Sequence, residues 1–150
     1  MPITYYTEED VKLPACVKKR RAVGLWIKTV ASTYGKKIGS VAYLFCSDEK
    51  ILEVNRYYLQ HEYYTDIITF DYTEGDVLSG DIYISPDTVR SNSERFRTDS
   101  EEELFRVIIH GILHLCGVND KTPEEQAEMT VAENKALALL PPECSINRNR

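Results

Sequence analysis

Hydrophobic side chains crowd the stretch between Ser100 and Asp120 and leave no wide polar face, which is the pattern of a helix buried on all sides. Ser100 and Glu103 form the Ser-x-x-Glu pattern of a helix start, and Gly117 is the residue type that commonly ends a helix. The apolar positions are Leu104, Phe105, Val107, Ile108, Ile109, Ile112, Leu113 and Leu115. With its charged first turn, the segment is too short and too interrupted to cross a bilayer. The sequence therefore predicts a helix at the centre of a globular domain.

The remaining apolar runs alternate between strand-like and helix-like patterns. Aromatic and β-branched residues predict strands at 3–7, 41–46, 67–72 and 80–85. Helical spacing, prolines and capping residues predict further helices at 14–34, 48–59, 86–97 and 122–140. We expect an α/β (α+β) fold, in which a small mixed sheet of about four strands packs with about five helices around the central helix.

Three of the predicted helices carry stripes that we expect to face inward. These are Ala22, Leu25, Trp26, Thr29 and Thr33 in the first, Ile51, Leu52 and Tyr58 in the second, and Met129, Ala132, Glu133, Ala136 and Leu140 in the last. Ser47 and Ser85 stand where helix caps are expected, and Thr122 with Glu125 forms a second capping box.

At 150 residues, the chain is long enough for one domain, which we expect to span residues 1–150. Its 43% hydrophobic and 28% charged residues are typical of a soluble globular protein. We find no signal peptide, lipidation motif or apolar run suited to a membrane, and expect a cytoplasmic protein without a membrane partner. The four cysteines are widely spaced without a Cys-x-x-Cys motif, which favours free thiols over a disulfide framework.

The net charge of −6 argues against broad, non-specific binding to nucleic acids, and we expect no DNA partner. Basic residues nevertheless gather in and just after the first predicted helix: Lys18, Lys19, Arg20, Arg21, Lys28, Lys36 and Lys37. Two interpretations of this group remain open. It is either a solvated helix face or a surface that follows the phosphates of RNA.

Two of the three histidines lie four residues apart in the central helix, so His110 and His114 present their rings on one face. Gly117 ends the helix, and the next turn brings Asp120 back, giving the pattern His-x-x-x-His-x-x-Gly-x-x-Asp. Two imidazoles and one carboxylate suit a zinc site whose fourth position is left for water. The alternative is a pair of core histidines, but burying two imidazoles without partners is costly.

Gly111 directly follows the first histidine, where zinc proteases of the His-Glu-x-x-His type carry their general base. Because glycine is unfavourable within a helix, its presence also predicts that another backbone or a substrate approaches closely. A peptidase would lack its base, whereas activation of water by the metal needs no such residue. The motif therefore favours a metal-dependent hydrolase other than a peptidase.

The run from His110 to Gly117, His-Gly-x-Leu-His-Leu-x-Gly, resembles the signature of the YbeY family of bacterial endoribonucleases, also called rRNA maturation factors. Residues 55–70 resemble the family's Thr-Asp/Asn-Val-Leu-Ser-Phe block, and Gly80–Ile84 agrees with a third motif in the same order. Two positions depart from the family pattern. Asp120 stands where the family has a histidine, and Leu59 stands where it has an arginine associated with RNA cleavage.

The resemblance implies a zinc-dependent, single-strand-specific endoribonuclease that acts at the 3′ end of 16S rRNA, in ribosome biogenesis and in ribosome quality control. One Zn²⁺ per chain, held by His110, His114 and Asp120, would act through its bound water. Arg56, with His61 and Lys121 as further candidates, would supply the cation that is missing from position 59. The expected partners are single-stranded ribosomal RNA and proteins of the small ribosomal subunit.

Other candidate RNA contacts lie outside the metal motif. The candidate RNA-binding cations are Lys18, Lys19, Arg20, Arg21 and Lys121, and the candidates for stacking on bases are Tyr63, Tyr64 and Phe70. Asp66 and Asp81 are expected to support the ligands from behind or to lie in turns, since a ligating histidine usually donates its second N–H to such a group.

Two other functions remain open. The first is a ribosome-associated assembly factor with a structural zinc and little nuclease activity, which the missing arginine supports. The second is a metal-dependent hydrolase of another substrate, such as a peptide, which Gly111 disfavours. A fourth ligand from Cys116 or Cys144 would favour the structural zinc, because structural sites are usually closed by four protein ligands, whereas an exposed water would favour the nuclease.

Overall fold

The computed structural model describes residues 3–8, 10–59 and 65–144. Its central sheet has four strands in the order β1-β2-β4-β3, formed by β1 (Ile3–Thr7), β2 (Lys37–Phe45), β3 (Ile67–Asp71) and β4 (Val77–Ile84). The first three strands of this order are parallel, and β3 pairs antiparallel with β4 to form one edge. Within the described residues, the predicted mixed sheet of four strands is confirmed.

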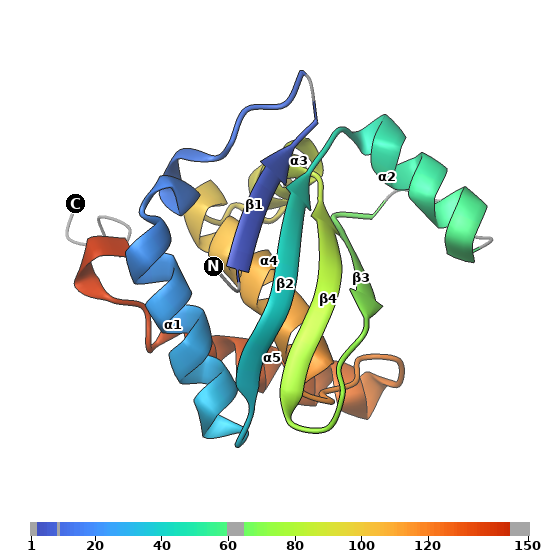
Figure 1. Ribbon diagram of the computed structural model, residues 1–150. Helices are drawn as coiled ribbons and strands as arrows, with labels where there is room; N and C mark the ends of the chain where they lie inside the picture. The colour runs from blue at the N-terminus through green and yellow to red at the C-terminus, as the bar shows by residue number, and fades with distance from the viewer. Residues whose placement is uncertain (1–2, 9, 60–64, 145–150) are drawn as a thin grey trace.

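Five α-helices surround the sheet: α1 (Arg20–Thr33), α2 (Asp48–Val54), α3 (Pro86–Phe96), α4 (Ser100–Leu115) and α5 (Pro123–Leu137). Short turns of other helix types precede α1, extend α2 and follow α5, at Ala15–Lys18, Asn55–Leu59 and Pro142–Cys144. In Figure 1, α4 and α5 lie behind the sheet, while α1 and α2 lie on opposite sides of it. The α+β class and the number of helices agree with the prediction.

The helix α4 lies in the middle of the hydrophobic core, as its pattern predicts. Phe105, Ile108, Ile109, Ile112 and Leu113 are all 0% exposed. The hydroxyl of Tyr43 on β2 donates a hydrogen bond to the backbone carbonyl of Ile108 over 2.9 Å, which ties the helix to the centre of the sheet. No helix among the described residues is both long and apolar enough to cross a membrane.

The predicted close approach at Gly111 is made by side chains of the sheet and not by another backbone. A Cβ atom at this position would lie 2.9 Å from Cδ1 and 3.1 Å from Cγ2 of Ile82, and 3.3 Å from Cδ1 of Ile67. Because both isoleucines belong to the sheet, the glycine lets α4 lie directly against β3 and β4.

The first predicted helix is shorter than expected, and its inner stripe is different. A 3-10 turn at Ala15–Lys18 precedes α1, which begins only at Arg20. Leu25 is 57% exposed, and Thr29 and Thr33 are exposed as well. The inward residues are Ala22, Val23, Trp26, Ile27, Val30 and Ala31. Apolar residues are dense enough in this helix to support two adjacent stripes, and the sheet and α4 select the one containing Val23 and Ile27.

Two other details of the predicted helices are wrong. Tyr58 is 68% exposed because α2 ends at Val54 and continues as a wider π-helical turn, which rotates the following side chains away from the core. The cap of α4 is Asp99, whose carboxylate accepts the N–H of Glu101 over 3.0 Å, so Ser100 is already the first helical residue. The predicted caps at Ser47, Ser85 and Thr122 are confirmed.

Candidate metal centre

The two histidines of α4 and the aspartate after it meet because the chain reverses tightly between them. Gly117 has φ +99°, a left-handed conformation that glycine adopts readily. The backbone N–H groups of Gly117 and Val118 bond to the carbonyls of His114 and Leu113, each over 3.0 Å. This turn satisfies the end of the helix and points the chain back toward His114.

The segment carrying Asp120 is fixed on its other side by the start of α5. Thr122 and Glu125 form the predicted capping box, in which the side chain of each accepts a backbone N–H of the other. The Glu125 carboxylate also accepts the backbone N–H of Lys121 over 3.2 Å. Asp120 is therefore held between two capped helix ends, a helix C-terminus and a helix N-terminus.

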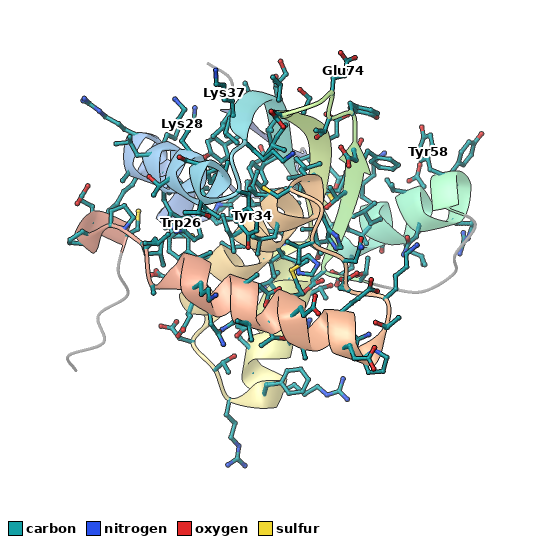
Figure 2. The ribbon with its side chains drawn as sticks, turned by 90° about the horizontal axis from the view of Figure 1, so that it is seen from below. Trp26, Lys28, Tyr34, Lys37, Tyr58 and Glu74 are labelled. Atoms are coloured by element: carbon teal, nitrogen blue, oxygen red, sulfur yellow. The ribbon has the colours of Figure 1, made fainter. Side chains whose placement is uncertain are left out.

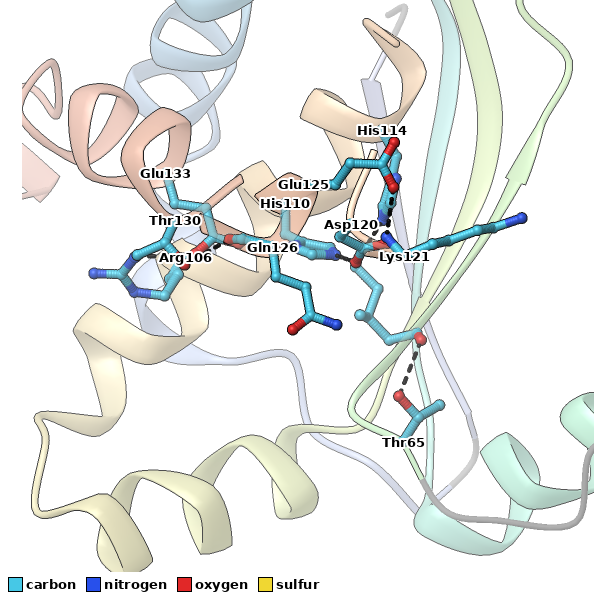
Figure 3. Close-up of polar contacts among 11 residues, drawn as sticks. Thr65, Arg106, His110, His114, Asp120, Lys121, Glu125, Gln126, Thr130 and Glu133 are labelled. Carbon is cyan, nitrogen blue, oxygen red and sulfur yellow. Dashed lines mark hydrogen bonds and ion pairs between the residues drawn. The ribbon is translucent and has the colours of Figure 1, made fainter. Parts of the chain in front are cut away.

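The three side chains converge on one point (Figure 3). An Asp120 carboxylate oxygen lies 3.3 Å from Nε2 of His110 and 3.2 Å from Nε2 of His114. One ligand atom from each of the three residues lies within 4.8 Å of the others. Among the described residues, no other group of His, Cys, Asp and Glu side chains has this geometry, and none of the four free cysteines belongs to it.

Behind His110 stands a second carboxylate from α5. The Oε2 atom of Glu133 lies 2.6 Å from Nδ1 of His110, and its Oε1 atom lies 3.0 Å from Nη1 of Arg106. Glu133 is only 8% exposed. Its inward position was predicted from the sequence, but its contact with His110 was not, because the two residues lie 23 positions apart. A lone glutamate on an otherwise apolar stripe was the available signal.

The two histidines have different electrostatic surroundings. Burial lowers the pKa of His110, but the hydrogen bond and charge of Glu133, together with the charges of Asp120 and Asp66, outweigh it and raise the pKa above its ordinary value. Burial and the neighbouring His110 lower the pKa of His114, against the opposing charge of Asp120. His114 therefore loses its proton more readily than His110.

The histidines open into a pocket of about 530 Å³ beside the edge strand β3. Besides His110, His114 and Asp120, it is lined by Thr65, Asp66, Ile67, Thr69, Asp71 and Asn119. Burial raises the pKa of the Asp66 carboxyl, although the positive charge of His110 and a hydrogen bond with Asn92 oppose the shift. No lysine or arginine is among the described residues that line this pocket.

The candidate cations lie elsewhere. Arg56 is exposed on the π-helical turn, and the side chain of Lys121 extends away from the two histidines (Figure 3). Lys18, Lys19, Arg20 and Arg21 lie around the start of α1, where they line a shallow depression with Glu143. His61, Tyr63 and Tyr64 fall outside the described residues, as does the side chain of Leu59.

The two remaining candidates lie on the face of the sheet away from the histidines. Phe70 packs against the small cluster under α2, and its ring centroid lies 5.8 Å from that of Tyr83. Asp81 is in the middle of β4, not in a turn, and alternation places it on the side opposite Ile82, which faces Gly111. Of the two predicted supporting aspartates, the structure therefore brings only Asp66 to the pocket.

Fold and site together define a small α+β protein with a cluster of two histidines and one aspartate beside a sheet edge. The family model for Endoribonuclease YbeY matches residues 7–140, so the chain belongs to the Endoribonuclease YbeY family. The resemblance identified in the sequence is thus confirmed, and the chain is classed with RNA-cleaving hydrolases.

Similar proteins cover nearly the whole chain. Endoribonuclease YbeY of Parabacteroides distasonis is 67% identical over 144 residues, covering 96% of this chain and 99% of that protein. The protein of the same name from Bacteroides fragilis is 66% identical over 139 residues, covering 93% of this chain and 98% of that protein. Among solved structures, the solution structure of TM1509 from Thermotoga maritima has 25% sequence identity, a TM-score of 0.66 and 99% coverage of both chains.

Proposed function

We propose that this protein is a zinc-dependent endoribonuclease that cleaves single-stranded RNA, with His110, His114 and Asp120 as the metal ligands. The biological setting that we propose is the maturation of ribosomal RNA, including the 3′ end of 16S rRNA, and ribosome quality control in the cytoplasm. The family supports cleavage of RNA. The setting and the metal rest on the resemblance of the motifs and on the chemistry of the cluster.

The spacing of the three donor atoms is the observation that carries the proposal. Ligand atoms bound to a tetrahedral zinc at about 2.0–2.2 Å lie about 3.3–3.5 Å from each other. The Asp120 oxygen lies 3.3 Å and 3.2 Å from the two Nε2 atoms. Two imidazoles and one carboxylate are also a donor set that zinc accepts in catalytic sites. The residues present therefore fit the ion.

The site is of the open kind. A structural zinc is usually closed by four protein ligands, and among the described residues the cluster contains three. When bound in such a site, zinc lowers the pKa of a coordinated water and stabilises negative charge on a phosphoryl oxygen. The pocket beside it offers the neutral hydrogen-bonding side chains of Thr65, Thr69 and Asn119 to a phosphodiester. Asp66 also lines the pocket, and burial raises the pKa of its carboxyl.

An aromatic row beside the pocket supports single-stranded RNA as the substrate. On β3, Thr69 and Asp71 line the pocket, whereas Phe70 between them points to the other face. The Phe70 ring lies edge-on to Tyr58, with 5.9 Å between the ring centroids, and Tyr58 is 5.6 Å from Tyr57. Tyr57 and Tyr58 are 79% and 68% exposed. Exposed rings can stack on unpaired bases, and only the width of an edge strand separates them from the pocket.

The decisive experiment compares wild-type protein, His114→Ala and Cys116→Ala, each purified identically, stripped of metal with a chelator and reloaded with zinc. We expect one zinc per wild-type chain and cleavage of a labelled single-stranded RNA that disappears on stripping and returns with zinc. His114→Ala should cut no faster than buffer, because one donor is missing. Cys116→Ala should behave as wild type, because that half-buried thiol is outside the cluster.

Other outcomes would contradict the proposal in distinct ways. Equal cutting by wild type and His114→Ala would reveal a contaminating ribonuclease. Zinc bound to wild type without any cutting would instead favour the assembly factor with a structural zinc. One observation supports that second function: carboxylates, and no lysine or arginine, are found among the described residues lining the pocket. A nuclease needs positive charge near the phosphate, and no side chain in the described part of the pocket lining other than the histidines can carry it.

A further inference from the structure

Glu133 is the one charged residue that is buried in the described part of the chain, and it contacts His110 on the side of the ring away from Asp120. It lies on α5, is 8% exposed and points across the helix interface toward α4 (Figure 3). A buried carboxylate needs a partner for each of its oxygens. Glu133 has two different ones: Nδ1 of His110 at 2.6 Å and Nη1 of Arg106 at 3.0 Å.

The contact with His110 constrains which ring nitrogen carries the proton. A carboxylate oxygen can only accept a hydrogen bond, so Nδ1 of His110 must be the donor. In a neutral ring, the Nε2 atom then keeps its lone pair, and this atom is the one that lies 3.3 Å from Asp120. The same contact therefore fixes the rotation of the ring and turns the ligating atom toward the cluster.

Arg106 holds Glu133 in place from the outer side. Arg106 precedes His110 by one helical turn on α4, and its Nη2 atom donates to Oδ1 of Asn134 over 2.9 Å. The guanidinium thus spans two neighbouring residues of α5 and presents Glu133 to His110. His114 differs in this respect: among the described residues, Asp120 is the one carboxylate that shifts its pKa, and its further hydrogen bond is with the backbone of Val118.

We propose that Glu133, braced by Arg106, is a positioning residue that holds His110 in the Nδ1–H form with its Nε2 atom directed at the metal. The proposal rests on the proposed function insofar as it assumes a zinc ion at His110, His114 and Asp120. A carboxylate behind a ligating histidine raises the basicity of the ring and fixes its orientation, and removing such a partner typically weakens metal binding about 10–100-fold.

The test measures zinc affinity by competition with a chromophoric chelator, together with the ring nitrogen NMR shifts of the histidines in metal-free protein. Glu133→Gln removes the charge at nearly constant volume. The double variant R106M/E133L removes the whole ion pair without leaving a buried charge unpaired. Glu128→Gln, an exposed glutamate on the same helix, is the matched control.

We expect the dissociation constant for zinc to rise about 10–100-fold in both Glu133 variants and to stay unchanged in Glu128→Gln. In R106M/E133L, the NMR shifts of His110 should change from a single Nδ1–H form to a mixture of forms, while those of His114 stay as they are. A purely structural ion pair would change the unfolding temperature and leave both readouts untouched.

The outcomes separate this role from the proposed function. Folded Glu133 variants that bind zinc as tightly as wild type and keep the Nδ1–H form overturn the role of Glu133 alone. Wild-type protein that binds no zinc overturns the metal site itself, and the role of Glu133 falls with it. If Glu133→Gln does not fold, the double variant decides between the same outcomes.

Discussion

A single glycine sets how closely the helix with the two histidines lies on the sheet. Gly111 follows His110 directly, so any shift at this position moves the histidine as well. A methyl group on Gly111 would lie only 2.9 Å from Cδ1 of Ile82, and Ile82 is 0% exposed. Since the core offers no room, a methyl group would have to push α4 away from β4.

Gly111→Ala should therefore lower the free energy of unfolding, even though alanine is the better helix former. Overpacking a core costs about 1–3 kcal/mol, against a gain in helix propensity of about 1 kcal/mol. We expect a net loss of about 1 kcal/mol in urea unfolding. Ile82→Val removes the closest atom but keeps the contact at 3.1 Å with Cγ2, so in that background Gly111→Ala should be less destabilising than in wild type. Equal effects in both backgrounds would mean that the contact with Ile82 does not limit the packing.

At the level of elements, two helix ends hold the segment that carries Asp120. The left-handed Gly117 ends α4, and the capping box of Thr122 and Glu125 begins α5. Between them the chain has little freedom, because backbone N–H groups on both sides are already bonded. The order of Asp120 is thus a property of the two helices and not of the turn itself.

Thr122→Ala should cost about 1 kcal/mol of stability, since it removes an N-cap side chain, and should also weaken zinc binding. The effect on zinc arises because binding would then have to order Asp120 as well. Thermal unfolding and chelator competition measure the two effects separately. Thr130→Ala is the matched control, because the hydroxyl of Thr130 donates to the carbonyl of Gln126 within α5, on the exposed side of the helix. If Thr130→Ala also weakens zinc binding, the effect arises from a less stable α5 and not from the loss of the cap that orders Asp120.

The elements that the sequence predicted well are those with local signals. The apolar run of α4, the Ser85-Pro86 start of α3 and the capping box of α5 each contain their own start or stop. The predictions were wrong where tertiary packing determines which side chains are buried. The inward stripe of α1 depends on which face the sheet covers, and the exposure of Tyr58 depends on a π-helical turn for which the residues carry no plain signal.

The difference between local sequence signals and tertiary packing also decides which residues of the site could be predicted. His110, His114 and Asp120 could be grouped from the sequence because one helix and one turn bring them together. Glu133, Asp66 and Asp71 come from other elements, and only the packing of α5 and β3 against α4 places them near the histidines. Spacing therefore predicts the ligands of a local motif, whereas their supporting residues require the fold.

At the scale of the whole molecule, the two proposed RNA surfaces, the basic residues at the start of α1 and the aromatic row beside β3, lie apart. Figure 2 shows Lys28 of α1 and Tyr58 on opposite sides of the molecule. The basic residues at the start of α1 line a depression that does not include any residue of the pocket at the histidines. Phe70 of the aromatic row lies on β3 between Thr69 and Asp71, which line the pocket, so this row is the nearer of the two proposed surfaces.

We therefore expect Tyr58→Ala to raise the KM for a short single-stranded RNA with little change in kcat, since stacking on one base contributes about 1–3 kcal/mol. That range corresponds to a rise of about 5–150-fold. Tyr6→Ala is the control, because Tyr6 is 55% exposed on β1, at the opposite edge of the sheet.

Replacing Lys18 and Arg21 together by glutamate should leave cleavage of the short RNA within about twofold of wild type, because screening at physiological salt limits surface charges to about 8 Å. If the charge reversal abolishes cleavage of the short RNA while Tyr58→Ala does not, the strand follows α1 and the aromatic row is not its path.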